Sequence, residues 1–507
     1  MRSRKVLVNT IANVFNILAI LISTLIVPRL IINTFGSDYN GLVSSISQFI
    51  GWSMLLRMGI LPVTRAALYK PLAQKDIKTV SEIVLATKKF MRKIAYVFSV
   101  LLLLMACLYP FFVIDDFVWL FSFSLVLIIG IREAVRFFVG ITYQTLIEAD
   151  QKQYLISGIN IVTTILIIIA SVLTISIGVD LRIVMLITAA LSSINPIFIC
   201  IYSKQYYRFI ENVEPDYTAI RQRWHAFAIS LTQFVNNNMD IIIITIFLDV
   251  YEVSVYSVYY LAILGIQQIF ITVTKGIGNF FGDMIARGEN ELMYKNLRIY
   301  ELVTFVFTTF VFSVAIIQLT PFVSVYTAGV TDIYYYRPVF GIMACSAAFF
   351  HCVRTPYQSI VEAAGHFKQT RNGAIVEVAM HIALSLVLVQ VVGITGAVIG
   401  MLASGIFRTF QYSYYLYKKI VQKRFILFVK RLLLSLSAIC IVLSISAFLD
   451  MDTPSNYTQW ITNSCVYSGI VLPIILAVNL IFYRDEMHMF YKKVKSGLKK
   501  KRKGTLA

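Results

Sequence analysis

The chain has 507 residues, of which 58% are hydrophobic and 14% are charged, which is too apolar for a soluble protein of this length. Apolar stretches of about 20 residues, the length that a bilayer-spanning helix needs, recur from end to end and leave no room for a soluble domain. The formal net charge of +19 lies mainly in short loops and a lysine-rich tail, which favours contact with anionic headgroups and argues against nucleic acid. The six cysteines stand singly, without the paired spacing of a metal site or disulfide framework.

Hydropathy predicts an all-α polytopic membrane protein with about fourteen transmembrane helices. The first run follows the basic residues Arg2 to Lys5 and has no small-residue cleavage site, so we read it as a retained span and not a signal peptide. The expected spans are Val6–Phe35, Asn40–Tyr69, Phe90–Val113, Phe117–Ile147, Leu155–Ile177, Arg182–Tyr202, Trp224–Leu248, Val253–Ala286, Leu297–Val325, Val339–Ala364, Ala374–Val392, Thr395–Tyr417, Ile426–Leu449 and Trp460–Tyr483.

The charges of the loops between these spans alternate with the side of the membrane. If the N-terminus is cytoplasmic, the outside segments contain only Arg182 and Arg337 among the basic residues, whereas they hold several aspartates. This distribution obeys the positive-inside rule, and a wrong span count would scramble it. The sequence therefore predicts a multi-pass membrane protein with both termini in the cytoplasm.

One segment of the first half is repeated in the second. Residues 143–149 (YQTLIEA) reappear as residues 357–363 (YQSIVEA), each copy at the inner end of an expected span. Six spans separate the copies, an even number, so both enter the membrane in the same sense as a parallel repeat. We expect two six-helix lobes, residues 1–218 and 219–422, followed by a C-terminal helix pair and basic tail, residues 423–507. Such halves work by alternating access around a midplane cavity, which indicates transport.

Short motifs in the first two spans give the chain a recognisable pattern. They are Asn13, Pro28-Arg29-Leu30, Phe35-Gly36, Tyr39-Asn40-Gly41, Arg57-Met58-Gly59 and Thr64-Arg65. With these, the chain resembles the multidrug/oligosaccharidyl-lipid/polysaccharide exporter superfamily and, within it, the flippases of O-antigen and capsule repeat units. The resemblance implies a V-shaped fold of two lobes and, as cargo, an undecaprenyl-pyrophosphate-linked oligosaccharide.

Several basic residues fall within the expected spans, where a charge is costly and usually faces a cavity or a partner. A cavity that they line would suit pyrophosphate, because guanidinium groups bind phosphate oxygens bidentately. The candidate pyrophosphate ligands are Arg57, Lys275, Arg136, Arg354, Arg132, Arg65 and Arg29. The alternative is structural. Arg132 would then pair with Glu133, Arg354 would pair with Glu362 or His351, and Arg29 and Arg65 would reach the headgroups.

Amide and acidic side chains within the spans supply the remaining candidates. The saccharide contacts are expected at Asn236, Asn237, Asn238, Gln267 and Gln268. An intramembrane carboxylate is a reasonable Na⁺ or H⁺ site, and Asp240 with Glu377 is the candidate coupling pair. A helix-locking hydrogen bond is the alternative for both carboxylates. With the cytoplasm negative, the membrane potential would favour outward movement of an anionic cargo and the inward return of an empty cationic cavity.

Three classes of function compete at this stage. The favoured one is a flippase for a lipid-linked oligosaccharide, with a lipid II-type flippase as a close variant. A cation-coupled multidrug exporter of the same superfamily is disfavoured because span one lacks a carboxylate and the lumen candidates are basic. A membrane polymerase or ligase is disfavoured because the outer loops are short, so we expect no enzyme activity and no cofactor. Membrane lipids and the polymerase and glycosyltransferases of a surface-polysaccharide pathway are the expected partners.

Overall fold

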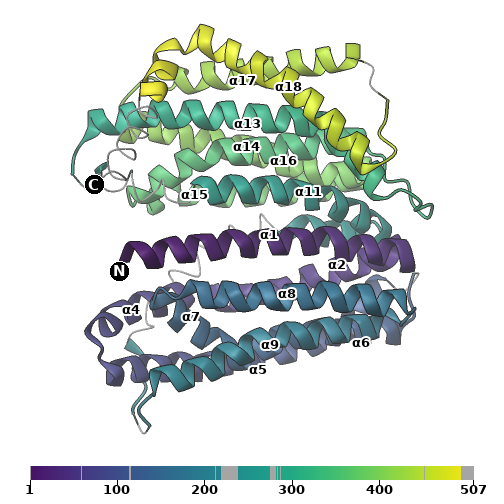
Figure 1. Cartoon of the computed structure of the whole chain (residues 1–507), viewed down its shortest axis with the longest axis vertical. Coiled ribbons are helices and arrows are strands. Elements are labelled where there is room, and N and C mark those ends of the chain that lie inside the picture. The colour runs from purple at the N-terminus through teal and green to yellow at the C-terminus, as the bar shows by residue number, and fades with distance from the viewer. Residues whose placement is uncertain are drawn as a thin grey trace, which may run out of the picture. The chain divides into compact units, whose positions relative to one another are not determined.

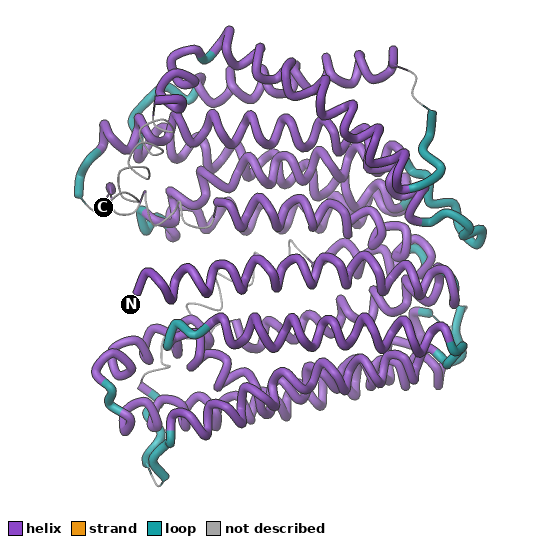
Figure 2. Tube along the Cα trace, viewed as in Figure 1, coloured by secondary structure: helices purple, strands orange, loops and turns teal. Residues whose placement is uncertain are grey.

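All regular elements that the structure describes are helices, joined by short loops (Figure 2). The computed structural model describes residues 2–58, 60–113, 116–211, 213–218, 238–274, 281, 284–285, 287–449 and 452–492. The chain divides into two compact units, of which unit 1 comprises Met1–Ser257 with Gly329–Ile333 and unit 2 comprises Val258–Ala328 with Tyr334–Ala507. The expected all-α class is confirmed, and the boundaries 1–218, 219–422 and 423–507 stay a prediction.

Unit 1 is built from the first helices of the chain, which run largely side by side (Figure 1). They are α1 (Arg2–Phe35), α2 (Ser37–Gly51), η1 (Trp52–Met54), α3 (Leu55–Met58), α4 (Ile60–Gln74), α5 (Ile77–Leu108), η2 (Tyr109–Phe112), α6 (Trp119–Val135), η3 (Arg136–Gly140), α7 (Ile141–Ala149), α8 (Gln153–Ser176) and α9 (Leu181–Tyr207). The element η3 is a single π turn between α6 and α7.

Unit 2 holds most of the remaining helices. They are α11 (Val250–Thr274), which begins in unit 1, α13 (Asn290–Tyr326), α14 (Pro338–Ala363), α15 (Phe367–Val392), α16 (Ile394–Tyr415), the π turn η5 (Leu416–Ile420), α17 (Ile426–Leu449) and α18 (Tyr457–Phe482). Within this unit α17 and α18 pack on α13, as Figure 1 shows in yellow and green.

Ten of the described helices are long and apolar enough to cross a membrane, so the chain is a multi-pass membrane protein. The other expected spans correspond to α2–α4, to α6–α7, to a short helix at Asn238–Phe247 and to α16. The second span is not one continuous helix, because α2 ends at Gly51 and a 3₁₀ turn separates it from α3. Most of the seventh lies outside the described residues, and the count of fourteen stays a prediction.

Hydrogen-bonding side chains on α2 hold it against residues 238–257 of the same unit. The amide of Asn40 donates to the hydroxyl of Ser254 at 2.8 Å, and the hydroxyls of Ser45 and Thr245 are also 2.8 Å apart. Gln48 donates to the side chain of Asn238 at 2.8 Å. In an apolar surrounding such neutral bonds satisfy polar groups without burying a charge.

The two copies of the internal repeat fold alike. Gln144 donates to Glu148 at 3.0 Å, and Gln358 donates to Glu362 at 2.7 Å, four residues along in each case. Each helix then ends in the same way, with a backbone N–H bonded to the carbonyl five residues back, Lys152 to Ile147 at 3.0 Å and His366 to Val361 at 3.2 Å. This is the Schellman ending, so equal sequence gives equal local structure in both units.

Candidate functional site

A chain of charged and amide side chains runs through unit 1. Arg65 of α4 pairs with Glu148 of α7, and Glu148 also accepts from Gln144 at 3.0 Å. Gln144 accepts in turn from Arg136 of η3 at 3.4 Å. Glu133 of α6 lies 3.8 Å from Arg136 and 3.5 Å from Arg132. The connected groups come from four elements of unit 1, which are α4, α6, η3 and α7.

Arg57 of α3 belongs to the same cluster but forms no ion pair within 4 Å with any residue that the structure describes. Its side chain is 6% exposed, and the charges that act on it most strongly are those of Arg136, Glu133, Arg132 and Glu148. We call Arg57, Arg65, Arg132, Glu133, Arg136 and Glu148 the arginine cluster. Four arginines and two glutamates leave it a formal net charge of +2. A buried charge in a membrane helix usually faces a partner or a cavity, which makes Arg57 a candidate for binding a ligand.

The π turn places Arg136 beside its partners. It inserts extra backbone between α6 and α7, so that Arg136 and Gln144, eight residues apart, meet through their side chains. At its end Gly140 lies against α9, where a Cβ would overlap Pro196. A π turn inside a helix often marks a functional site, and here it also requires a residue without a side chain.

A cavity of about 330 Å³ adjoins the arginine cluster within unit 1. One wall carries Arg132, Glu133, Arg136 and Gln144, and α8 and α9 supply Asn160, Thr163, Thr164, Ser192 and Asn195 on other walls. The guanidinium groups of Arg132 and Arg136 approach Glu133 only loosely, so most of their N–H donors are left for a ligand. The cavity thus combines positive charge with neutral hydrogen-bonding groups.

The basic residues of unit 2 are arranged differently, because a carboxylate holds them. Arg354 of α14 lies 2.6 Å from Glu377 of α15, and Arg408 of α16 lies 3.2 Å from the other oxygen of the same carboxylate. A nitrogen of Arg354 also lies 3.0 Å from the ring nitrogen of His351. The structural alternative for Arg354 was a pair with Glu362 or His351. The structure shows the contact with His351, and the carboxylate that Arg354 meets is that of Glu377, not Glu362. The triad joins three helices of one unit.

The other predicted site residues are scattered. Arg29 is half-buried on α1, Gln267 is half-buried on α11 and Gln268 is exposed on the same helix. Asn238 binds Gln48, and Asp240, 3% exposed, accepts from Tyr256 at 3.1 Å. Asp240 belongs to unit 1 and Glu377 to unit 2. Lys275, Asn236 and Asn237 lie outside the described residues.

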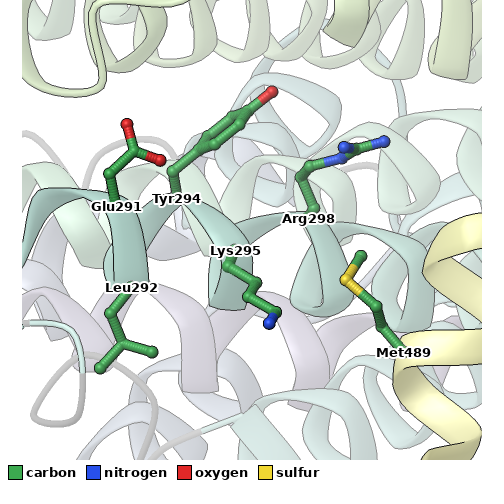
Figure 3. Close-up of a pocket in the computed structure, with 6 residues that line it drawn as sticks. All are labelled: Glu291, Leu292, Tyr294, Lys295, Arg298 and Met489. Carbon is green, nitrogen blue, oxygen red and sulfur yellow. The ribbon is translucent and has the colours of Figure 1, made fainter.

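A second hollow, of about 370 Å³, lies in unit 2 at the start of α13. Figure 3 shows its lining side chains, which are Glu291, Leu292, Tyr294, Lys295, Arg298 and Met489. Arg298 is paired with Glu486, which is 3% exposed, and Lys423 reaches Glu291 at 3.7 Å. Because Glu291 and Arg298 are matched within the protein, this hollow is a weaker candidate than the arginine cluster. Among the described residues no group of His, Cys, Asp or Glu is arranged to hold a metal ion.

The structure was compared with solved structures, and several of them have a similar fold. It aligns with the lipid II flippase MurJ in an inward closed conformation with a TM-score of 0.73 and 16% identity, over 95% of this chain and 100% of that one. It also aligns with an inward-facing MATE multidrug transporter of the MOP superfamily with a TM-score of 0.52 and 11% identity, over 81% of this chain and 95% of that one. The chain has the multidrug/oligosaccharidyl-lipid/polysaccharide exporter fold.

A further example of the exporter fold is the MATE transporter VcmN of Vibrio cholerae, which matches with a TM-score of 0.55 and 14% identity, over 82% of this chain and 98% of that one. No family model matches the sequence, and no curated protein matches it. At these identities the structural similarity defines the exporter fold, and the function has to be argued from the residues of this chain.

Sequence reasoning missed the polar wall of α8 and α9 and one buried network. Asn160 and Asn195 stand in otherwise apolar spans, and this was the signal that could have identified them. In unit 2, Glu301 is 2% exposed, accepts from Tyr357 at 2.7 Å and Tyr417 at 2.9 Å, and lies 3.8 Å from Arg431. This network fastens α17 to α13 and α14.

Proposed function

We propose that the protein is a flippase that moves an undecaprenyl-pyrophosphate-linked oligosaccharide from the cytoplasmic to the outer leaflet of a bacterial inner membrane, for surface-polysaccharide biosynthesis. The two lobes would work by alternating access. The arginine cluster of unit 1 carries the proposal. Its formal net charge of +2 suits a diphosphate, and its guanidinium groups supply the paired N–H donors that phosphate oxygens bind.

A drug exporter of the same fold is less consistent with these residues. A cationic drug would be repelled by Arg57, Arg132 and Arg136, and residues 6–35 of the first helix contain no carboxylate to attract it. The alternative that the comparisons favour is a lipid II-type flippase, since the fold of MurJ matches a larger share of this chain than the MATE structures do. Both flippase proposals require recognition of a lipid diphosphate.

The driving force that we propose is the membrane potential. One charge crossing 100 mV gains about 2.3 kcal/mol, and a negative cytoplasm favours the exit of an anionic cargo and the return of an empty cationic cavity. A coupling ion, Na⁺ or H⁺, is a second element of the proposal, with Asp240 as the better candidate. Glu377 already lies between Arg354 and Arg408, which would oppose binding of a cation.

The direct test of the proposal is transport in proteoliposomes. The purified protein is reconstituted, and the flipping of a fluorescent undecaprenyl-diphospho-oligosaccharide is measured for the wild type and for a variant with Arg57→Ala and Lys275→Ala. We expect at least tenfold slower flipping in the variant, because charge-assisted hydrogen bonds to the diphosphate are lost.

The matched control carries Lys418→Ala and Lys419→Ala, which remove two exposed charges from the π turn η5 of unit 2. This control should flip at the wild-type rate. Equal rates for the wild type and the Arg57 and Lys275 variant, with equal amounts of folded protein, would refute the proposed diphosphate site.

A further inference from the structure

The cavity of unit 1 has a neutral polar wall that the arginine cluster does not explain. On α8 this wall presents Asn160, Thr163 and Thr164, and on α9 it presents Ser192 and Asn195. Both helices are membrane-long and mostly apolar, so an amide side chain at these depths is costly unless it has a partner or a ligand. All five residues border the same cavity as Arg132 and Arg136.

The amides of this wall keep hydrogen-bonding capacity after their own contact is made. Asn195 donates to the side-chain oxygen of Asn160, which joins α9 to α8. Each amide has two N–H donors and an oxygen with two acceptor sites, so one bond leaves most of this capacity unused. The hydroxyls of Thr163 and Ser192 donate to backbone carbonyls of their own helices and remain able to accept. A pair that served only to hold two helices together would be packed in protein, whereas this one borders a hollow.

The size and the chemistry of the cavity select a class of ligand. Its volume, about 330 Å³, is at the lower end of the range for small-molecule sites, which suits one sugar unit better than a chain of sugars. Sugar hydroxyl and acetamido groups both donate and accept hydrogen bonds, as do amides and hydroxyls of the wall. A first sugar attached to a diphosphate would meet these groups while the diphosphate meets Arg132 and Arg136.

We propose that the Asn160–Asn195 wall is a saccharide subsite, which binds the sugar unit next to the diphosphate inside unit 1. The inference rests on the proposed flippase function and extends it. It moves recognition of the first sugar from the amides predicted at residues 236–238 and 267–268 to α8 and α9. The subsite also explains why Glu133 contacts Arg132 and Arg136 only at 3.5 and 3.8 Å, since guanidinium groups held this loosely can turn towards a ligand.

The test compares lipid diphosphates that carry a sugar with one that does not. Binding of the full-length protein in detergent is measured for undecaprenyl pyrophosphate and for undecaprenyl-diphospho-glucose, -galactose and -N-acetylglucosamine. We expect at least one glycosylated probe to bind more tightly than undecaprenyl pyrophosphate. Asn195→Ala should weaken binding of that probe by about three- to tenfold, the effect of losing a neutral hydrogen bond, and leave undecaprenyl pyrophosphate unchanged.

Three further variants make the outcomes separable. Arg136→Gln should weaken all the probes, whereas Asn479→Ala, an amide on α18 that donates to its own helix, should weaken none. Thr164→Val is the milder change to the wall if Asn195→Ala fails to fold, and it should show the same selectivity.

Equal binding of glycosylated and bare probes by the wild type, or equal losses for both in the wall variants, would overturn the saccharide subsite and leave the diphosphate site standing. Failure of the wild type to bind any probe would refute the proposed function and the subsite together.

Discussion

The carboxylate of Glu377 gives the sharpest prediction about unit 2, because two roles for it lead to opposite results. Its oxygens lie 2.6 Å from Arg354 and 3.2 Å from Arg408, and the three side chains are only 8%, 11% and 5% exposed. The change Glu377→Gln leaves two buried guanidinium groups without a counter-charge. Breaking a buried pair in this way costs about 3 to 5 kcal/mol. If the triad is a structural lock, thermal unfolding of the purified protein should therefore begin at a clearly lower temperature.

The matched control for this prediction is Glu133→Gln in unit 1. Its contacts with Arg132 and Arg136 are longer, 3.5 and 3.8 Å, and the side chain of Arg132 is 55% exposed. Glu133 is itself buried, but its contacts are longer than those of Glu377 and Arg132 is largely exposed, so we expect a smaller fall in Tm than for Glu377→Gln. A Tm for Glu377→Gln equal to that of the wild type, together with lost ion dependence of transport, would refute the lock and favour the coupling role.

Three other predictions concern packing, pH and voltage. In α16, Gly396→Ala should lower the Tm, because the added Cβ would overlap the backbone of Leu388 at a cost of about 1 to 3 kcal/mol. The control is Gly469→Ala on α18, where the added Cβ meets no atom within 4 Å and the Tm should not change. Just before the second expected span, burial and then the charge of Asp332 raise the pKa of Asp38. The ionised form is thus disfavoured in the folded state, so Asp38→Asn should stabilise the protein at neutral pH, by an amount that vanishes as the pH falls below about 4; a gain that persists in acid would contradict this. In proteoliposomes, an imposed potential, negative on the side where the cargo is loaded, should accelerate flipping, and an unchanged rate would exclude a voltage-driven step.

Much of the fold follows from hydropathy and charge. Apolar length predicts α8 to within two residues at each end, since a helix is the structure that satisfies its own backbone in a bilayer. The helix α9 ends five residues later than expected, and α13 begins seven residues earlier. The internal repeat could also be predicted from the sequence. In the structure its two copies form the same Gln-to-Glu hydrogen bond and the same helix ending. These features depend on neighbours that are close in the sequence.

Partners that are distant in the sequence could not be predicted in this way. Composition identifies Arg57 and Arg354 as equally costly charges. Only the fold shows that Arg354 meets Glu377, whereas Arg57 pairs with no carboxylate among the described residues. Hydropathy also does not detect the π turn after α6, which places Arg136 beside Gln144. Roles in transport for the predicted site residues stay predictions, since they depend on a cargo.

The central claim is that the arginine cluster of unit 1 binds the diphosphate of the cargo. The most direct measurement compares the binding of undecaprenyl pyrophosphate with that of uncharged undecaprenol, for the wild type and for Arg57→Gln. We predict that the wild type prefers the pyrophosphate and that Arg57→Gln loses about 10-fold or more of this preference without a change in undecaprenol binding. An equal preference in the two proteins would contradict the claim.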